Sequence, residues 1–285
     1  MKRASCFVAC VVSVIAAEAS ASNEALVVAS EQKPFLDAQQ AAVEALSGHG
    51  KEMQATELRA RAAEVSGARV VVSVGPLASR RAAPALGPDA RIVACLTPSL
   101  TGLPPGRSFV VPLNASPTDV LDVLKRALPA ARRVGVLIGD SDDVGGITVA
   151  ARAKKITVDL EREASTQAIA ERLLQSSDVL WVHPSHPVAR DPEALQLLLN
   201  RAFDRGVPVV GGSRTMVLQG ALFALVPEPA EHGRIAGEVA ERLLRGERVG
   251  DVPSPRGRVV LNGRVARALK LALPAAVTKG AEQVE

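Results

Sequence analysis

Residues 206–225 read GVPVVGGSRTMVLQGALFAL, a short apolar run that ends in two glycines, a polar triplet, and a second apolar run. Short, nearly continuous runs rich in valine that close on glycine are typical of parallel strands buried on both faces of a sheet. The triplet Ser213, Arg214 and Thr215 follows the strand directly. Parallel sheets bind ligands beyond the carboxyl ends of their strands, so this stretch predicts a buried strand with a ligand-facing turn.

The same kind of apolar run recurs along the chain, and helical stretches separate the runs. The runs are residues 25–30, 69–75, 91–97, 133–140, 156–161, 178–184 and 207–212. The helical stretches are residues 35–46, 57–65, 117–128, 166–175, 192–205 and 232–245. For residues 192–205, Asp191 supplies a cap, Pro192 suits the first turn, and Gly206 ends the helix. Alternating strands and helices predict an α/β doubly wound architecture.

The alternation breaks at residues 110–120, VVPLNASPTDV, where two prolines precede a new helix and a new first strand. This break predicts two doubly wound, Rossmann-like lobes joined by hinge strands, with a cleft between them. We expect the N-terminal lobe to hold residues 24–111 and about 226–258. The C-terminal lobe should hold residues 112–225 and about 259–285. Crossover strands are expected near residues 110–111, 225–226 and 259–261.

Residues 1–23 have the form of a secretory signal peptide, because Lys2 and Arg3 precede an apolar run over residues 6–17 and small residues follow. Ala19-Ser20-Ala21 offers a cleavage site, so we expect export to the periplasm. An N-terminal membrane anchor and lipidation of Cys10 remain alternatives. Cleavage would leave Cys95 as the single thiol, and stability would then depend on the core rather than on a disulfide.

The composition argues for a globular protein that does not bind nucleic acid. Hydrophobic residues make up 47% of the chain, charged residues 22% and aromatic residues 2%, with no tyrosine. The net charge is +4, and it becomes +3 once Lys2, Arg3 and Glu18 are removed. Nucleic-acid surfaces need clustered cations and stacking rings, and the sequence has neither.

The predicted ligand-binding residues are the small and polar residues at the predicted strand ends of both lobes. They are Ser30, Glu31, Gly75, Pro76, Thr97, Pro98, Asp140, Ser141, Ser185, His186, Gly212, Ser213 and Arg214. A guanidinium such as that of Arg214 suits a carboxylate or phosphate. At any single position an ordinary turn is the better interpretation, and Arg214 could simply face solvent. Both lobes contribute such ends, which favours a shared ligand site.

Enzymatic and metal-binding alternatives fit the residues less well. The stretch 211–215, GGSRT, has Thr215 where a nucleophile elbow needs a second glycine. His183 and His186 flank Pro184 on a predicted loop and lack helical metal-ligand spacing. Asp140, Asp142 and Asp143 resemble a calcium loop without its bidentate glutamate. No G-x-G-x-x-G follows a strand, so we predict no enzyme, no metal and no cofactor.

The C-terminal part of the chain resembles a known family of binding proteins. The residues that carry the resemblance are Pro208-Val209, Gly211-Gly212, Met216-Val217, Gly220-Ala221-Leu222, Glu231-His232-Gly233-Arg234, Ala236-Gly237, Leu244-Arg245-Gly246-Glu247, Pro253, Leu261-Asn262, Ala266 to Leu269 and Leu273-Pro274. Weaker matches lie upstream at Pro34, Val74-Gly75-Pro76, Thr97-Pro98 and residues 133–137. This order of features resembles the ABC-transporter substrate-binding proteins of the tryptophan-binding type, with a type I periplasmic-binding fold.

The resemblance implies a monomer that captures a small solute, amino-acid-like or an organic anion, and hands it to an ABC permease. At two positions the residues depart from the family pattern, so the family's ligand does not carry over to this chain. Thr97 stands where the family commonly has an aspartate, and Ser185-His186 stand where it often has an Asp-Asn pair. Gly145-Gly146 are also expected to interrupt the helix after Asp140. A periplasmic sensor or partner-binding module that works without a transporter is the alternative function.

Overall fold

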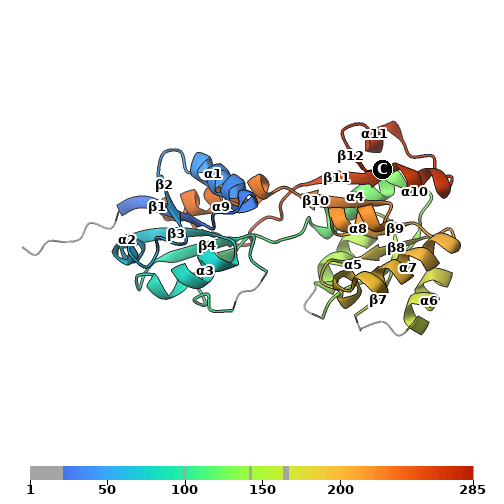
Figure 1. Cartoon of the computed structure of the whole chain (residues 1–285), viewed down its shortest axis with the longest axis horizontal. Helices are drawn as coiled ribbons and strands as arrows, with labels where there is room; N and C mark the ends of the chain where they lie inside the picture. Colours follow the sequence, from blue (N-terminus) through green and yellow to red (C-terminus); the bar gives the residue numbers. More distant parts are fainter. Residues whose placement is uncertain (1–21, 99–100, 141–142, 163–166, 285) are drawn as a thin grey trace, which may run out of the picture.

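The computed structural model describes residues 22–98, 101–140, 143–162 and 167–284 of the chain. These residues form two lobes, each built on its own sheet (Figure 1). The predicted α/β class with two lobes is therefore confirmed.

The sheet of the N-terminal lobe is entirely parallel and includes one strand that the sequence pattern missed. Its strand order is β2 (Gly50–Gln54), β1 (Ser22–Ala29), β3 (Ala68–Val74), β4 (Arg91–Cys95) and β5 (Ser108–Val110). On β1, Val27 packs into the core on one face and Val28 into the core on the other. Burial of both faces explains why the strands read as continuous apolar runs.

The sheet of the C-terminal lobe is larger and mixed. Its strand order is β12 (Glu282–Val284), β11 (Gly257–Asn262), β10 (Phe223–Pro227), β9 (Val209–Gly211), β8 (Val179–Val182), β6 (Arg133–Leu137) and β7 (Thr157–Glu161). The strands from β10 to β7 are parallel, whereas β11 is antiparallel to β10 and β12 runs parallel to β11.

Helices cover both faces of each sheet. Those of the N-terminal lobe are α1 (Lys33–Ala45) and α9 (Pro229–Leu244) on one face, and α2 (Ala62–Gly67), α3 (Pro76–Ala82) and the short η1 (Ala83–Ala85) on the other. Those of the C-terminal lobe are α4 (Pro117–Ala127), α5 (Val144–Ala153), α10 (Gly263–Ala268) and α11 (Ala275–Thr278) on one face, and α6 (Gln167–Ser176), η2 (Pro187–Arg190), α7 (Pro192–Asp204) and α8 (Arg214–Gln219) on the other.

The two lobes share one strand order. Counting strands along the chain, both sheets run 2-1-3-4-5, in the N-terminal lobe from β1 and in the C-terminal lobe from β6. In such sheets the order reverses between the first and third strands, and a crevice forms there at the carboxyl ends. Each lobe therefore has one switch point, between β1 and β3 and between β6 and β8.

Local signals in the sequence explain several helix ends. The side chain of Asp191 accepts hydrogen bonds from the backbone N–H groups of Glu193 and Ala194, each at 3.1 Å, and so caps α7. Gly206 follows α7 with φ +70°, a conformation that glycine adopts without steric cost. These features agree with the predicted start and end of the helix.

Three local expectations were wrong. Residues 57–61 form turns, because Arg61 pairs with Glu57 and Glu64, and α2 begins only at Ala62. Gly145 and Gly146 lie in the first turn of α5 and do not interrupt it. β2, GKEMQ, was missed because its polar residues are exposed at a sheet edge.

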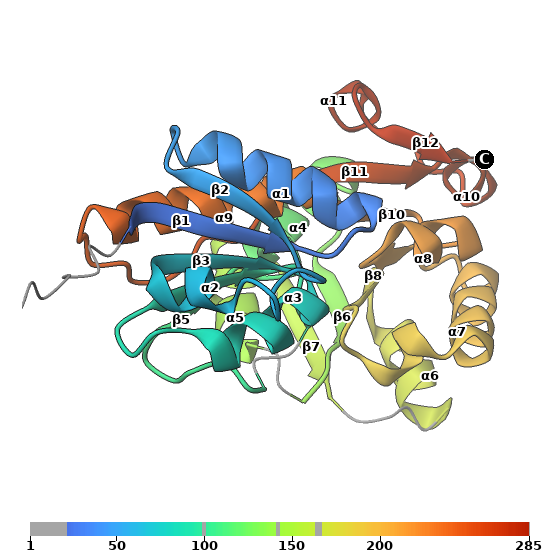
Figure 2. The ribbon, with the colours of Figure 1, turned by 60° about the vertical axis from the view of Figure 1, so that its left-hand side comes forward.

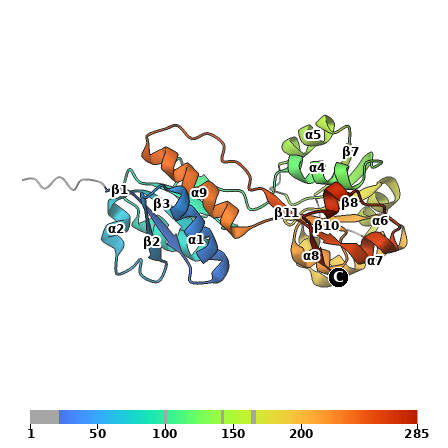
Figure 3. The same cartoon turned by 90° about the horizontal axis from the view of Figure 1, so that it is seen from above.

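The carboxyl ends of the two sheets lie on the sides of the lobes that are joined. β5 leads through residues 111–116 to α4 of the C-terminal lobe, and β10 leads directly into α9 of the N-terminal lobe. Since β5 is parallel to β4 and β10 is parallel to β9, the carboxyl edge of each sheet is the edge nearest the other lobe. Figures 1 and 3 show that connections, rather than packed helices, join the lobes, and Figure 2 gives a view turned by 60° from that of Figure 1.

Helix α9 returns to the N-terminal lobe and packs tightly on α1. A Cβ atom added at Gly233 would lie 1.9 Å from the carbonyl oxygen of Ala38, and one at Gly237 would lie 2.4 Å from that of Ala42. Only glycine permits two helix backbones to approach this closely. The returning helix is therefore held by the small-residue faces of α1 and α9.

We expect Gly233→Ala to lower the free energy of unfolding by about 2 kcal/mol, because the new methyl group forces two backbones apart and this strain outweighs the helix propensity of alanine. Urea denaturation checks this value. The matched control is Gly67→Ala in α2, where an added Cβ meets nothing within 4 Å and stability should hold or rise. An equal loss in both variants would contradict the packing argument.

Candidate functional site

In the N-terminal lobe, the turns after β1, β3 and β4 form one edge. The backbone N–H of Gly75 donates to the carbonyl of Cys95 at 2.9 Å, which joins the turn after β3 to the end of β4. Thr97 is 4% exposed, whereas Pro98 is exposed. Because these strands are neighbours, the predicted residues Ser30, Glu31, Gly75, Pro76, Thr97 and Pro98 lie along this edge.

At Gly75, the side chain of Phe35, which was not among the predicted site residues, packs against this edge. The φ of Gly75 is +89°, and a Cβ atom added there would lie 2.9 Å from the ring of Phe35 on α1. The ring thus lies against the carboxyl end of β3. Phe35 follows the predicted pair Ser30 and Glu31 by only a few residues, but the sequence pattern identified it only as the start of the helical stretch 35–46.

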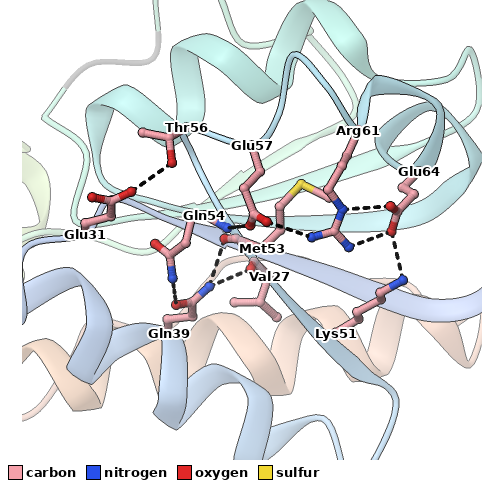
Figure 4. Close-up of polar contacts among 10 residues, drawn as sticks. All are labelled: Val27, Glu31, Gln39, Lys51, Met53, Gln54, Thr56, Glu57, Arg61 and Glu64. Carbon is pink, nitrogen blue, oxygen red and sulfur yellow. Dashed lines mark hydrogen bonds and ion pairs between the residues drawn. The ribbon is translucent and has the colours of Figure 1, made fainter.

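The predicted residue Glu31 makes a hydrogen bond of its own beside a polar network at the end of β2 (Figure 4). The Glu31 carboxylate accepts a hydrogen bond from the hydroxyl of Thr56 at 2.8 Å. Nearby, the buried amide of Gln39 donates to the carbonyls of Val27 at 2.8 Å and Met53 at 3.0 Å. These bonds attach α1 to the two strands and fix the loop that carries Thr56.

Gln54 ends β2 within the same network. Its amide nitrogen lies 3.4 Å from the Gln39 side-chain oxygen, and its backbone N–H donates to Glu57 at 2.8 Å. Among the described residues, the Gln54 side-chain oxygen is the buried polar side-chain atom that lacks a hydrogen-bond partner. Leaving such an oxygen without a donor costs free energy. No sequence pattern indicated this unpaired oxygen, because the strand itself was missed.

The outer end of the network is an ion-pair cluster. Arg61 donates to both oxygens of Glu64, and Lys51 donates to the same carboxylate at 2.8 Å (Figure 4). The Arg61 hydrogen bonds, with those of Lys51, lower the pKa of Glu64 to about 2. These exposed pairs hold the turn at residues 57–61 in shape, and they lie to one side of the predicted site residues.

In the C-terminal lobe, the turns after β6 and β8 are joined by a predicted residue. The Ser185 hydroxyl accepts a hydrogen bond from the backbone N–H of Gly139 at 3.0 Å and lies 2.6 Å from Nδ1 of His183. Ser185 is half-buried at the switch point of this lobe. His183, which directly follows β8, therefore orients a predicted ligand residue.

The turns after β8 and β9 also touch. A Cβ atom added at Gly212 would lie 2.1 Å from Cγ of Pro184, so the two turns approach as closely as glycine allows. The Ser213 hydroxyl caps α8 by accepting from the backbone N–H of Met216 at 3.3 Å. His186 is fully buried, and its Nδ1 accepts from the backbone N–H of Val188 at 3.2 Å. Both side chains thus have structural partners.

The turn after β6 is described only in part. Asp140 is exposed, and its carbonyl oxygen accepts a hydrogen bond from the guanidinium of Arg162 at the end of β7. The predicted residue Ser141 lies outside the described residues, as does Asp142. Asp143 stands at the N-cap position of α5.

Arg214, the first residue of α8, has a protein partner. Its Nε donates to the carboxylate of Glu282 on β12 at 2.6 Å, and 55% of its side chain is exposed. An exposed ion pair of this kind contributes at most about 1 kcal/mol. The bond uses one of the five guanidinium hydrogens, so the remaining donors can face a ligand.

Three cavities on the described surface lie away from the predicted residues. One of about 550 Å³ lies at the amino ends of β3 and β4, one of about 690 Å³ at the amino ends of β6 and β8, and one of about 600 Å³ between α9 and residues 253–258. Within the described ranges no cluster of three metal-binding side chains occurs, and no helix is long and apolar enough to cross a membrane.

Comparison with known proteins identifies the family. The sequence profile described as "ABC transporter substrate binding protein" matches residues 113–285, more than half of the chain. The chain belongs to the ABC transporter substrate-binding protein family. Among curated proteins, none matches the sequence.

Solved structures of low identity share the fold of this substrate-binding protein. A ligand-free, open substrate-binding protein with adhesive properties from Clostridium difficile aligns at 17% identity and TM-score 0.63, over 92% of this chain and 98% of that one. An ABC domain in complex with L-Trp from Streptococcus pneumoniae aligns at 18% identity and TM-score 0.54, with the same coverage. A conserved domain protein from Vibrio cholerae matches equally well.

The family and the type I periplasmic-binding fold predicted from the sequence are thus confirmed. The chain is a solute-binding protein and not an enzyme. The structure brings the predicted residues that it describes to the carboxyl edges of two sheets, one in each lobe. Their roles in ligand binding stay predictions.

Cys95 lies at the end of β4 beneath the turn at Gly75, and burial raises the pKa of its thiol to about 12. A raised pKa suppresses the reactive thiolate at neutral pH. We expect iodoacetamide at about pH 8 to leave Cys95 unmodified in the native protein and to alkylate it in guanidinium, as judged by peptide mass spectrometry. Rapid native alkylation would show that this edge opens to solvent.

Proposed function

We propose that this protein captures a small polar solute, amino-acid-like or an organic anion, between its lobes and delivers it to an ABC importer. The observation that supports this proposal is the topology. Both sheets have a 2-1-3-4-5 strand order, and both direct their carboxyl edges, with their switch points, toward the other lobe. Ligands of open parallel sheets bind at such edges.

Capture proceeds by closure of the lobes on the solute. In the arrangement described, extensive contacts between elements occur within the lobes, and connections join one lobe to the other (Figure 3). A ligand shifts this equilibrium toward closure only if it binds the closed form more tightly, which requires contacts to both lobes at once. Predicted residues on both edges meet this requirement.

The chemistry of the two edges supports a solute that carries both a donor and an anionic group. The N-terminal edge offers the Glu31 carboxylate, the Thr56 hydroxyl and the ring of Phe35. The C-terminal edge offers the Ser185 hydroxyl and the guanidinium of Arg214. A carboxylate that reaches Arg214 can use the guanidinium hydrogens that Glu282 does not engage.

Location and partner follow from the same proposal. The signal-peptide pattern of residues 1–23 supports export to the periplasm, where a closed, loaded protein presents both lobes to a membrane permease. The protein acts as a monomer in this scheme.

A thermal-shift screen of the protein against amino acids, organic acids, sugars and nucleosides tests the proposed function. We expect an amino acid or an organic acid to raise the melting temperature, because a ligand that binds only the folded state stabilises it in proportion to its occupancy. A response confined to sugars or nucleosides would contradict the solute class. No response to any solute would favour a module that works without a transporter.

If the screen identifies a carboxylate ligand, we expect Arg214→Ala to weaken its binding by about 1.5–3 kcal/mol, because a charge-assisted hydrogen bond is lost. Calorimetry measures this loss as a higher dissociation constant. The matched control is Arg133→Ala, which removes an arginine paired with Asp178 at the amino end of the same sheet. Binding by that control should be unchanged. Equal affinities for wild type and Arg214→Ala would remove Arg214 from the site.

A further inference from the structure

The C-terminal lobe carries a groove of about 690 Å³ at the amino ends of β6 and β8. The end of α4 with the loop that follows it, the start of β8, the connection from α7 to β9, and residues 270–272 after α10 line this groove. The residues proposed to bind the solute lie at the carboxyl ends of the same sheet. The groove therefore lies at the opposite end of the strands from the proposed solute site.

The lining of the groove is mostly apolar. Leu128 and Leu271 are half-buried and pack against the core of the lobe, and most of the other lining side chains are alanine, valine or proline. Pro129 and Pro208 have no backbone N–H to offer. A peptide laid along the groove needs backbone hydrogen-bond partners, whereas an alkyl chain needs none and gains free energy from the apolar area that it covers. The lining thus favours an alkyl chain.

The loop that follows α4 is held in place from within the protein. The ammonium of Lys125 donates to the carbonyl of Pro129 at 2.9 Å and to that of Ala131 at 2.8 Å. The carboxylate of Asp178 accepts from the backbone N–H groups of residues 132 and 133, at 2.8 and 2.9 Å. These bonds engage the polar backbone groups of the loop, so this wall of the groove is already formed before anything binds.

Positive charge exceeds negative charge along the groove. The cations that line it are Arg132, Arg133 and Lys270, whereas Asp178 provides the one lining carboxylate, which is paired with Arg133 at 3.2 Å. Arg132 and Lys270 are exposed and have no ion-pair partner within the described part of the chain. Burial and the charge of Arg132 lower the pKa of the Lys125 ammonium. The cations here repel one another, and a bound anion would relieve that repulsion.

We propose that this groove is a second binding site, which takes a free single-chain amphiphilic carboxylate such as a medium-chain fatty acid. The alkyl chain lies along Leu128 and Leu271, and the carboxylate reaches Arg132 and Lys270. Apolar area and charge-assisted hydrogen bonds both contribute to binding. The site uses no residue of the carboxyl edges, so it does not depend on which solute is captured between the lobes.

Calorimetric titration with decanoate, kept below the concentration at which it forms micelles, tests this site. We expect saturable binding of one decanoate per protein, about tenfold tighter than that of octanoate, because each buried CH₂ group adds to the binding free energy. Decanol has the same chain without the charge and should bind about tenfold more weakly. Equal affinities for decanoate and decanol, or no saturable binding of decanoate, would overturn the proposal.

The double variant Arg132→Gln, Lys270→Gln should weaken decanoate binding by about tenfold, because two exposed charge-assisted contacts are lost. The matched control is Arg152→Gln, Lys155→Gln, which removes the same charges from exposed positions at the end of α5 in the same lobe. Its lysine has φ +56° and Lys270 has φ +55°, so the backbone strain is also matched. The control should bind as wild type does. An equal loss in both double variants would show an effect of net charge alone and contradict the site.

Amide NMR spectra recorded during the titration locate the bound decanoate. We expect shifted signals at residues 127–133 and 270–272, which line the groove. Shifts confined to the turns at Ser185 and Gly212 would place decanoate at the proposed solute edge, which would overturn the groove and leave the proposed function intact. Binding to vesicles of phosphatidylglycerol without binding of soluble decanoate would also overturn the proposal, because the groove would then recognise a membrane surface.

Discussion

The close packing of α9 on α1 is the constraint on which the two-lobed structure depends. The chain leaves the N-terminal lobe after β5 and builds most of the second lobe. It returns only because the faces at Gly233 and Gly237 fit against the carbonyls of Ala38 and Ala42. Without this contact, α9 would have no place in the first core, whose cluster includes Ile235 and Val239. The lobes would then be joined by one crossover instead of several.

Several crossovers restrict how the lobes can move. A single connection permits rotation in any direction, whereas connections that run side by side, such as β10 and β11, favour opening and closing about one region. The start of α9 is that region. Glu228 directly precedes the helix and forms an ion pair with Arg258 on β11. The imidazole of His232 in its first turn lies 3.1 Å from the carbonyl oxygen of Leu113, in the connection from β5. The helix that completes the N-terminal core therefore also sets the position of the hinge.

Most of the predicted site residues lie where parallel-sheet topology places them, but several have partners that the sequence did not reveal. Ser213 caps α8, Glu31 accepts from Thr56, and Arg214 pairs with Glu282, which lies 68 positions further along the chain. Thr56 and Glu282 come from other parts of the chain, whereas Ser213 caps the helix that it precedes. A pattern of strand ends identifies the edge of a sheet, but it contains no information on which side chains there are already engaged.

The sequence by itself determined the alternation of strands and helices, the division into two lobes and the family. Burial of both sheet faces requires apolar runs, and turns require glycine, proline and small polar residues, so both leave a pattern in the sequence. The sequence pattern missed β2 and β12, because both are short edge strands that carry exposed polar residues such as Lys51 and Gln283. Only the tertiary structure decided that Phe35 lies against Gly75 and that His232 contacts the carbonyl of Leu113. Those contacts join residues distant in the sequence, and their geometry depends on how helices and strands pack rather than on local propensity.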